Sequence, residues 1–232
     1  MRRVPVALLC CLLLAGCSRL VRLEARPLPT AAVAAPEQSL VYAADGSVIA
    51  TLRFANRVNV ERNDIPPVVI DAVLAAEDRR FYEHAGVDLR AVARAAVANR
   101  RAGRVVQGGS TLTQQLVKNR YFPDAAETLE RKSAEARLAL ALERDATKDE
   151  ILTDYLNTVY FGDGAYGIQA AARHYVGTDA ADLTLPQAAL LAGLIRSPER
   201  TDPREHPAAA AAARQRVLDA MVATGAVGVD EA

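Results

Sequence analysis

The chain has 232 residues, enough for one hydrophobic core and a small appendage, which excludes an assembly of several large domains. Hydrophobic residues make up 51% of it, which excludes a disordered chain. Lys and Arg balance Asp and Glu, 28 against 28, so a nucleic-acid binder held by its overall charge is also excluded.

The first residues have the pattern of a targeting signal. A basic start at residues 1–3 precedes an apolar run at residues 4–16, which is shorter than the about 20 residues of a membrane-spanning helix. We therefore predict a signal peptide over residues 1–17. Its end resembles a bacterial lipobox, which would make Cys17 a lipid anchor; a plain signal peptide and an uncleaved anchor are the alternatives. Cleavage before Cys17 would remove the other two cysteines, which would exclude cysteine catalysis and a Cys-ligated zinc.

A tether and a small β element are expected next. Residues 18–38 are rich in Ala, Pro and Arg without periodicity, which is typical of a tether. Two short apolar runs flank a turn signal at Asp45 and Gly46, so we predict a hairpin within residues 39–60. From residue 64 to residue 232 nearly everything reads as helix, and the expected fold is mainly α.

The first long apolar helix starts near Asp64 and Pro66 and runs into residues 77–86, Glu-Asp-Arg-Arg-Phe-Tyr-Glu-His-Ala-Gly. Acids at the end of an apolar helix are costly to bury and are therefore often functional. The alternative is a solvated helix end, where Arg79 and Arg80 favour the helix dipole.

A second helix is predicted from its cap, Asp88, to Arg101, with Gly103 closing it. Arg90, Arg94 and Arg101 share one face of this helix. A solvated surface is the preferred interpretation of that face, and contact with anionic lipid headgroups is the alternative.

Residues 107–119 begin with two glycines and continue with hydroxyl and amide side chains into a helical pattern. Such a loop can offer backbone N–H groups to an anion at a helix start. It lacks the Gly-Lys-Ser/Thr of a nucleotide-binding loop, and taken alone it favours a capped helix.

The next helix contains the most informative local pattern of the chain. Asp124 and Glu127 have the spacing of a capping box at its start. Helical geometry places Glu135 on the inward stripe with the leucines, and Arg131 and Lys132 lie one turn before it. A surface ion pair would normally face away from the leucines, so this arrangement indicates a prepared site.

The remaining helices follow from caps and breaks. Thr147 and Glu150 form a capping box, and glycines at residues 161–167 break the helix that follows it. Thr184 is expected to cap an apolar helix ending near residue 195, and a last amphipathic helix carries Val217, Leu218 and Met221.

Several of these segments, in this order, resemble the peptidoglycan glycosyltransferases, or glycosyltransferase family fifty-one. This family is the polymerising domain of class A penicillin-binding proteins and of monofunctional transglycosylases. The resemblance covers about residues 40–232 and implies one lysozyme-like helical domain over residues 39–232. Departures from the family pattern occur at Val176, Gln187 and residues 201–203. The segments that carry the resemblance are residues 77–86, 108–119, 131–135, 148–175 and 185–198.

The resemblance implies a hexosyl transfer in which lipid II is polymerised into β-1,4 glycan strands and lipid pyrophosphate is released. Glu77 would be the general base that activates the acceptor hydroxyl, and Glu135 would be the second essential carboxylate. Cations would stabilise the leaving pyrophosphate. The residues assigned to that role are Arg131, Lys132 and, as a third candidate, Lys118; the substrate-binding positions are Asp78, Ser110, Thr111, Gln114 and Gln115.

The stereochemistry predicts how the two acids are placed. An α-linked pyrophosphate that becomes a β-1,4 bond is inverted in one step, and inverting glycosidases separate their two carboxylates by roughly 6.5–9.5 Å. By analogy, we expect Glu77 and Glu135 to face one cleft with at least about that separation. The role of Glu135 stays open between positioning the cations, positioning a divalent metal and assisting departure. A metal cofactor, Mg²⁺ or Mn²⁺, is likewise left open.

The resemblance also implies location and partners. The expected partners are lipid II, the nascent glycan chain and a membrane surface, with other cell-wall synthesis or cell-division proteins as further candidates; nucleic acid is not expected. The chain would lie outside the cytoplasm, in the periplasm, anchored by its N-terminus, with the inner membrane favoured over the outer. Ser18 after Cys17 resembles an outer-membrane sorting context and conflicts with that preference. The sequence has no Ser-x-x-Lys and no Lys-Thr-Gly, so a monofunctional enzyme is expected.

Three alternatives accompany this interpretation. Tyr121, Phe122 and Pro123 lie where the family touches the membrane, and core packing explains them equally well. A lysozyme-like enzyme that cleaves glycan would need a catalytic acid but no basic pyrophosphate cluster. A non-catalytic cell-wall lipoprotein is disfavoured because every motif acid and cation is present.

Overall fold

The computed structural model describes residues 39–52, 56–123 and 125–232, and these are mostly helical. This confirms the predicted mainly α fold with a small N-terminal hairpin. The predicted signal peptide, the Cys17 anchor and the tether lie outside the described residues. Among the helices that are described, none is long and apolar enough to span a bilayer.

Two small sheets accompany the helices. Strands β1 (Ser39–Tyr42) and β2 (Val48–Leu52) pair antiparallel, as predicted. The second sheet was missed: β3 (Asn56–Arg57) pairs parallel with β5 (Ala165–Tyr166), which pairs antiparallel with β4 (Tyr160–Gly162). The predicted hairpin region, residues 39–60, is therefore too long, because β3 belongs to this other sheet.

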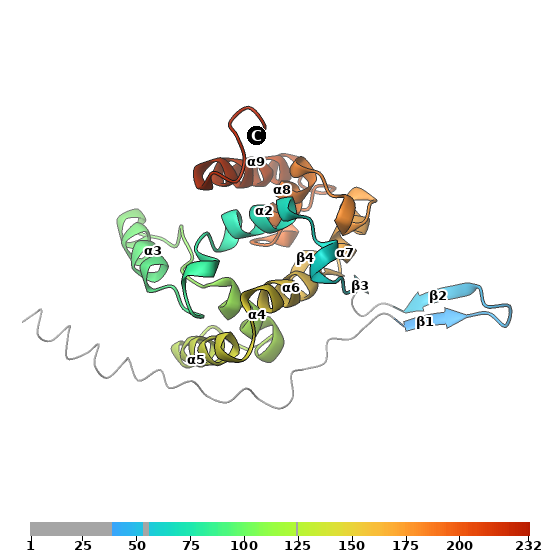
Figure 1. Cartoon of the computed structure of the whole chain (residues 1–232), viewed down its shortest axis with the longest axis horizontal. Coiled ribbons are helices and arrows are strands. Elements are labelled where there is room, and N and C mark those ends of the chain that lie inside the picture. Colours follow the sequence, from blue (N-terminus) through green and yellow to red (C-terminus); the bar gives the residue numbers. More distant parts are fainter. Residues whose placement is uncertain (1–38, 53–55, 124) are drawn as a thin grey trace, which may run out of the picture.

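The helical core has two groups of helices, which Figure 1 shows as neighbouring layers. In the first group, α2 (Pro67–Glu77), α8 (Leu185–Leu194) and α9 (Pro207–Thr224) pack on one another. In the second group, α4 (Leu112–Tyr121) packs on α5 (Leu129–Asp145) and on α6 (Lys148–Thr158). Apolar side chains of both groups join in one core.

Shorter elements complete the chain. A four-residue helix, α7 (Ile168–Ala171), continues into one turn of π-helix, η3 (Ala172–Val176). The 3₁₀ turns are η1 (Arg62–Asp64), η2 (Phe81–Glu83), η4 (Ala180–Asp182) and η5 (Pro198–Arg200).

Most of the predicted helix caps are present. The side chains of Thr111, Thr147 and Thr184 form capping boxes with the residue three positions later, and Asp88 accepts the N–H groups that open its helix. The predicted box of Asp124 and Glu127 is wrong, because Thr128 caps α5 with a hydrogen bond from the Arg131 N–H, 3.1 Å. Asp124 lies outside the described residues.

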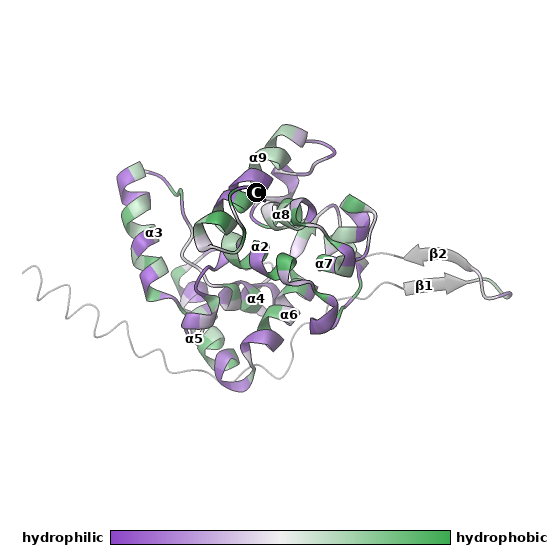
Figure 2. Ribbon diagram, turned by 45° about the horizontal axis from the view of Figure 1, so that its top comes forward, coloured by the Kyte–Doolittle hydropathy of each residue, from purple (hydrophilic) through white to green (hydrophobic). Residues whose placement is uncertain are grey.

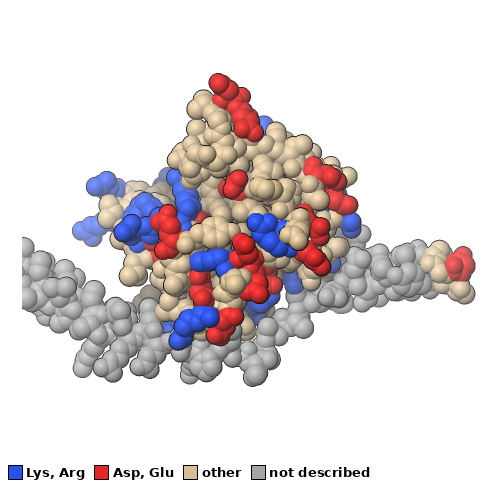
Figure 3. Space-filling model, in the orientation of Figure 1, with Lys and Arg blue, Asp and Glu red and all other residues tan. Residues whose placement is uncertain are grey.

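Helix α3 (Leu89–Ala102) stands apart from the two groups in Figures 1 and 2. Ala95 is its one buried residue, and Leu89 is 73% exposed. Its arginines face solvent, as preferred from the sequence, and Figure 3 shows a concentration of basic residues over this helix. Both the apolar and the basic faces of α3 are therefore accessible.

Tyr121 and Phe122 end α4 and begin the loop after it. Both side chains are partly buried and pack against the core. Their position favours the core-packing interpretation over membrane contact.

Candidate active site

Glu77 is the last residue of α2, and its carboxylate lines a cavity of about 650 Å³. The helix ends here because Asp78 leaves the helical conformation while its N–H still bonds to the Leu74 carbonyl, 3.0 Å. The helix α2, which packs in the core, thus places Glu77 at the edge of a cavity. Burial raises the pKa of Glu77, which favours a carboxylate that can accept a proton near neutral pH.

Two side chains from other helices orient Glu77. Gln115 of α4 donates from Nε2 to Glu77 Oε2, 2.9 Å, and this bond partly offsets the rise in the pKa of Glu77. The hydroxyl of Tyr155, on α6, donates to Gln115 Oε1, 3.0 Å. Gln115 was predicted to bind substrate; in the structure its amide bonds to Glu77 and to a core tyrosine.

Asp78 is buried and bonded within the protein. Its Oδ2 accepts from His84 Nε2 at 2.9 Å and from the N–H of Leu112 at 3.0 Å. Asp78 therefore joins the end of α2 to the start of α4. It lines the cavity, as a substrate-binding position should, but its described bonds hold the fold.

Thr111 and Gln114 likewise hold the start of α4. The Thr111 hydroxyl donates to the Gly86 carbonyl, 2.6 Å, and accepts from the N–H of Gln114, 3.1 Å. Gln114 Oε1 accepts from the N–H of Thr111, 3.0 Å. Thr111 lines the cavity and Gln114 does not, so the substrate-binding role predicted for Gln114 has no support in this geometry.

The second acid lies behind the cavity wall. Glu135 is 0% exposed, and its oxygens face Arg131 Nη1 at 3.1 Å and Lys132 Nζ at 2.9 Å. Lys132 Nζ also donates to the hydroxyl of Ser110, 2.8 Å, and Ser110 lines the same cavity as Glu77. The inward position of Glu135 and its two cations is thus as predicted.

One part of the predicted geometry is wrong. We expected both acids to face one cleft, but Glu77 lines the cavity and Glu135 does not; Lys132 connects Glu135 to Ser110 on the cavity wall. Lys118 does not join this cluster: it is exposed on α4 and does not line the cavity.

The residues around Glu135 do not fit a metal ion. Both of its oxygens already face cations, which would repel a divalent ion. Among the described residues, no group of three or more His, Cys, Asp or Glu side chains could hold a metal.

The sequence prediction missed several arginines at the cavity. Arg196, which follows α8, lines it and lowers the pKa of Glu77 by its charge. Arg94 of α3 lines it too, although its face was interpreted as solvated surface. Glu77 and Arg196 also border a second hollow of about 400 Å³ between α2, α8 and α9. Arg79 and Arg80 also line the larger cavity. The sequence held a signal for these two, because they are the adjacent arginines within residues 77–86.

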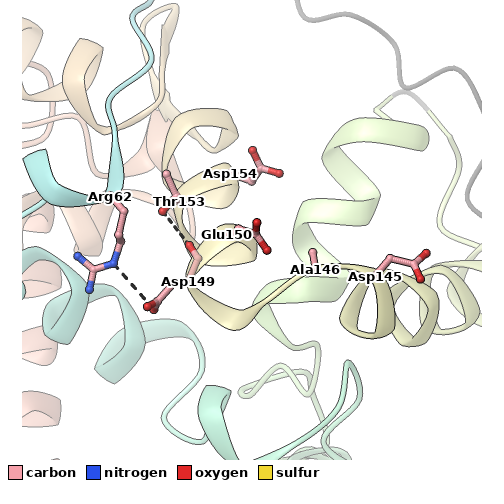
Figure 4. A pocket seen from close by; sticks show the side chains of 7 residues that line it. All are labelled: Arg62, Asp145, Ala146, Asp149, Glu150, Thr153 and Asp154. Carbon is pink, nitrogen blue, oxygen red and sulfur yellow. Dashed lines mark hydrogen bonds and ion pairs between the residues drawn. The ribbon is translucent and has the colours of Figure 1, made fainter.

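A third hollow, of about 510 Å³, lies at the start of α6 and is mostly acidic (Figure 4). Three of its four acids are engaged: Asp149 faces Arg62 at 3.9 Å, Glu150 caps α6, and Asp154 pairs with Arg120 at 3.0 Å. These contacts explain the acidic cluster as part of the structure.

The fold and the site define a mostly helical domain with a half-buried acid on a cavity and a cation-paired acid behind its wall. A comparison with protein families then matches residues 45–222 to the family described as transglycosylase. The chain belongs to this transglycosylase family. The resemblance inferred from the sequence motifs is thereby confirmed.

The relatives are penicillin-binding proteins. The chain is 44% identical over 199 residues to penicillin-binding protein 1A of Streptococcus oralis, covering 85% of this chain and 31% of the relative. It is 47% identical over 190 residues to penicillin-binding protein 1A of Aquifex aeolicus, covering 82% and 26%. The chain thus spans about a third or less of the length of these relatives.

A solved structure, penicillin-binding protein 1A of Haemophilus influenzae, is 21% identical with a TM-score of 0.48, covering 87% of this chain and 20% of that chain.

Proposed function

We propose that the chain polymerises lipid II into β-1,4 glycan strands and releases lipid pyrophosphate. One observation carries this proposal: Glu77 lines a cavity whose wall is backed, through Ser110, by Lys132 and its ion pair with Glu135. A general base and a cation then act in the same space. The membership of the transglycosylase family supports the same reaction type.

In this reaction Glu77 takes the proton of the acceptor sugar's 4-hydroxyl as that oxygen attacks the anomeric carbon of the donor. The new glycosidic C–O bond forms on the face opposite the lipid pyrophosphate, whose own C–O bond to the sugar breaks. The leaving group takes the electron pair of that bond. A positioned base typically contributes about 10²–10⁴ in rate.

Of the two cations paired with Glu135, Lys132 is the better placed to meet the departing pyrophosphate. Its side chain is 41% exposed and contacts Ser110 on the cavity wall, whereas the Arg131 side chain is only 6% exposed. We infer that Glu135 holds both cations in place and does not donate a proton, because it is fully buried between them. If Mg²⁺ or Mn²⁺ assists, we propose that it binds through the substrate pyrophosphate.

We further propose that the enzyme works on the outer side of the inner membrane, with Cys17 as the lipid anchor and residues 18–38 as the tether. The lipid-linked substrate requires a membrane surface nearby. Other cell-wall synthesis or cell-division proteins are the proposed partners.

Two parallel incubations test the reaction class. The purified chain is mixed with labelled lipid II, with and without magnesium, and separately with purified cell-wall glycan. Polymer from lipid II with intact cell-wall glycan is the expected result. Shortened cell-wall strands with no polymer would show a glycan-cleaving enzyme instead.

A further inference from the structure

A row of hydrogen bonds connects the buried Tyr155 to Glu77 through Gln115. Tyr155 is 0% exposed, and its hydroxyl donates to Gln115 Oε1, 3.0 Å. The other end of the same amide donates to Glu77 Oε2, 2.9 Å. The three residues come from α6, α4 and α2, so the row crosses the two helix groups.

We propose that Tyr155 is a positioning residue that fixes the orientation of the Gln115 amide and thereby keeps Glu77 in its ionised, proton-accepting form. This inference rests on the proposed function of Glu77 as a general base. Tyr155 does not line any of the three hollows described above, so it acts through Gln115 and not on the substrate.

A side-chain amide donates from its NH₂ end and accepts at its oxygen. With Oε1 held by the tyrosine hydroxyl, the NH₂ end faces Glu77 and stabilises a carboxylate. In the reverse orientation the NH₂ end would bond to the tyrosine oxygen, and the amide oxygen would face Glu77. Two acceptors would then meet, unless Glu77 were protonated. The hydrogen bond from the Tyr155 hydroxyl to Oε1 thus adds stability to the orientation that suits the base.

Burial helps to maintain the hydrogen bond that Tyr155 donates to Gln115. It raises the pKa of Tyr155 well above its ordinary value, with smaller contributions from the charges of Glu77 and Asp78. The phenol therefore keeps its proton, and stays a donor, wherever the enzyme works.

Other charged groups also face Glu77 and must be unchanged in the test. Arg196 lowers the pKa of Glu77 and Asp78 raises it, both by their charge. The other charged residues that line the two hollows bordered by Glu77 are Arg79, Arg80, Asp88, Arg94, Arg216 and Asp219. None of these is altered by a Tyr155→Phe substitution, which removes only one oxygen atom.

The substitution Tyr155→Phe, in the full chain, tests the proposal through the pH profile of kcat/KM for lipid II polymerisation. Without the hydroxyl the amide can reverse, the pKa of Glu77 rises and less of it is ionised on the acid side. We expect kcat/KM about five- to tenfold lower at acidic pH, returning toward the parent value as the pH rises, with the loss mainly in kcat. A loss of the same size at every pH would show that Tyr155 only supports the fold, and would overturn the proposal.

Two further variants sharpen the test. Tyr160→Phe is the matched control, because its hydroxyl also bonds to a side chain, Glu199 at 2.7 Å, on the exposed surface; its profile should match the parent. Gln115→Met removes the amide itself. Adding Tyr155→Phe to it should have no further effect on the pH profile if Tyr155 acts through Gln115, and a further acid-side loss would contradict that path.

A readout without substrate separates this inference from the proposed function. The side-chain carboxyl carbons of glutamate are labelled with ¹³C, and the Glu77 signal, assigned with Glu77→Gln, is titrated in the parent and in Tyr155→Phe. A higher Glu77 pKa in the variant supports the inference even if lipid II is not polymerised. An unchanged Glu77 pKa overturns it even if the parent enzyme is active.

Discussion

Glu77, the general base that we propose, meets two opposing requirements. A general base must be ionised to accept a proton, whereas burial favours its neutral form and raises its pKa. The structure balances these effects with the amide of Gln115 and the charge of Arg196, which both lower that pKa. The net effect is a raised pKa, which makes the ionised carboxylate of Glu77 a stronger proton acceptor.

The raised pKa of Glu77 predicts that Glu77→Gln becomes more stable, relative to the parent, as the pH rises. Because the folded-state pKa is raised, the stability associated with the protonated acid is present at low pH and is lost as the pH rises through that pKa. The amide does not ionise and avoids this loss. We therefore expect Tm of the variant minus Tm of the parent to increase from about pH 4 to pH 8. Thermal unfolding at several pH values measures it, and a constant or falling difference would contradict the prediction.

Glu135 offers a prediction of the opposite sign. Glu135→Gln leaves two cations beside a neutral group, and breaking a buried pair costs about 3–5 kcal/mol; partial exposure of Lys132 reduces that to roughly 2–4 kcal/mol. Glu127→Gln is the matched control, since Glu127 faces the same Arg131 at 3.4 Å with an 86% exposed side chain, and should cost under about 0.5 kcal/mol. Urea unfolding compares the two, and equal losses would refute the distinction.

At this scale the sequence predicted residue identity better than residue role. The helical position of Glu135, with two cations one turn behind it, was visible from spacing because helix geometry is local. The bonds of the Gln115 amide were not visible, since they join side chains 38 and 40 residues away. The capping box of Thr111 and Gln114 is local and was overlooked.

Among the elements, the loop after α2 joins more parts of the fold than its length suggests. Gly86 has φ of +86°, and its carbonyl accepts from Thr111. A Cβ atom built on it would lie 2.7 Å from the Ala139 carbonyl oxygen in α5. The loop therefore packs directly against the helix that carries Glu135.

Comparing two glycines tests how tightly this loop is packed. Gly86→Ala combines an unfavourable φ with a backbone clash and should destabilise the fold by at least about 3 kcal/mol. Gly103→Ala, at the end of α3, has a similar φ of +63° but open space around it, so it should cost only about 1 kcal/mol. Denaturant unfolding of both variants gives the comparison, and similar losses would show that the loop can move away from α5.

The elements also show where sequence patterns suffice. Of the four caps predicted by residue, those at Asp88, Thr147 and Thr184 are correct, because a cap depends on a few neighbouring residues. The cap of α5 was predicted at the wrong residue, because Asp124 and Glu127 have the spacing of a capping box. In the structure Thr128 caps the helix by accepting from the Arg131 N–H. The sheet of β3, β4 and β5 could not be found, because its parallel pair joins residues about one hundred positions apart.

For the whole molecule, the cavity is assembled from distant parts of the chain. Its lining comes from α2 and the loop that follows it, from α3, from the loop before α4 and the start of α4, and from Arg196 beyond the end of α8. Motif order indicated that these parts belong together, but not that Arg94 and Arg196 would complete the wall.

The exposed face of α3 predicts how the molecule meets a membrane. The helix presents the apolar side chains of Leu89 and Val92 together with arginines, a combination that favours anionic lipid surfaces. We expect binding to vesicles containing anionic lipid to weaken with salt. It should also fall severalfold when Arg90, Arg100 and Arg101 are changed to Gln.

A control for that experiment is available on α9. Changing Arg214, an exposed arginine of α9, to Gln should leave vesicle binding nearly unchanged. Sedimentation with vesicles measures both variants. Equal binding by the α3 variant and the parent would remove α3 as the contact surface.

The central claim is that Glu77 is the base of a lipid II polymerase, and gel electrophoresis of the products formed by the parent and by Glu77→Gln tests it most directly. We predict a ladder of glycan strands from the parent and none from the variant, while thermal unfolding shows that the variant is folded. Equal ladders from the two proteins would contradict the account.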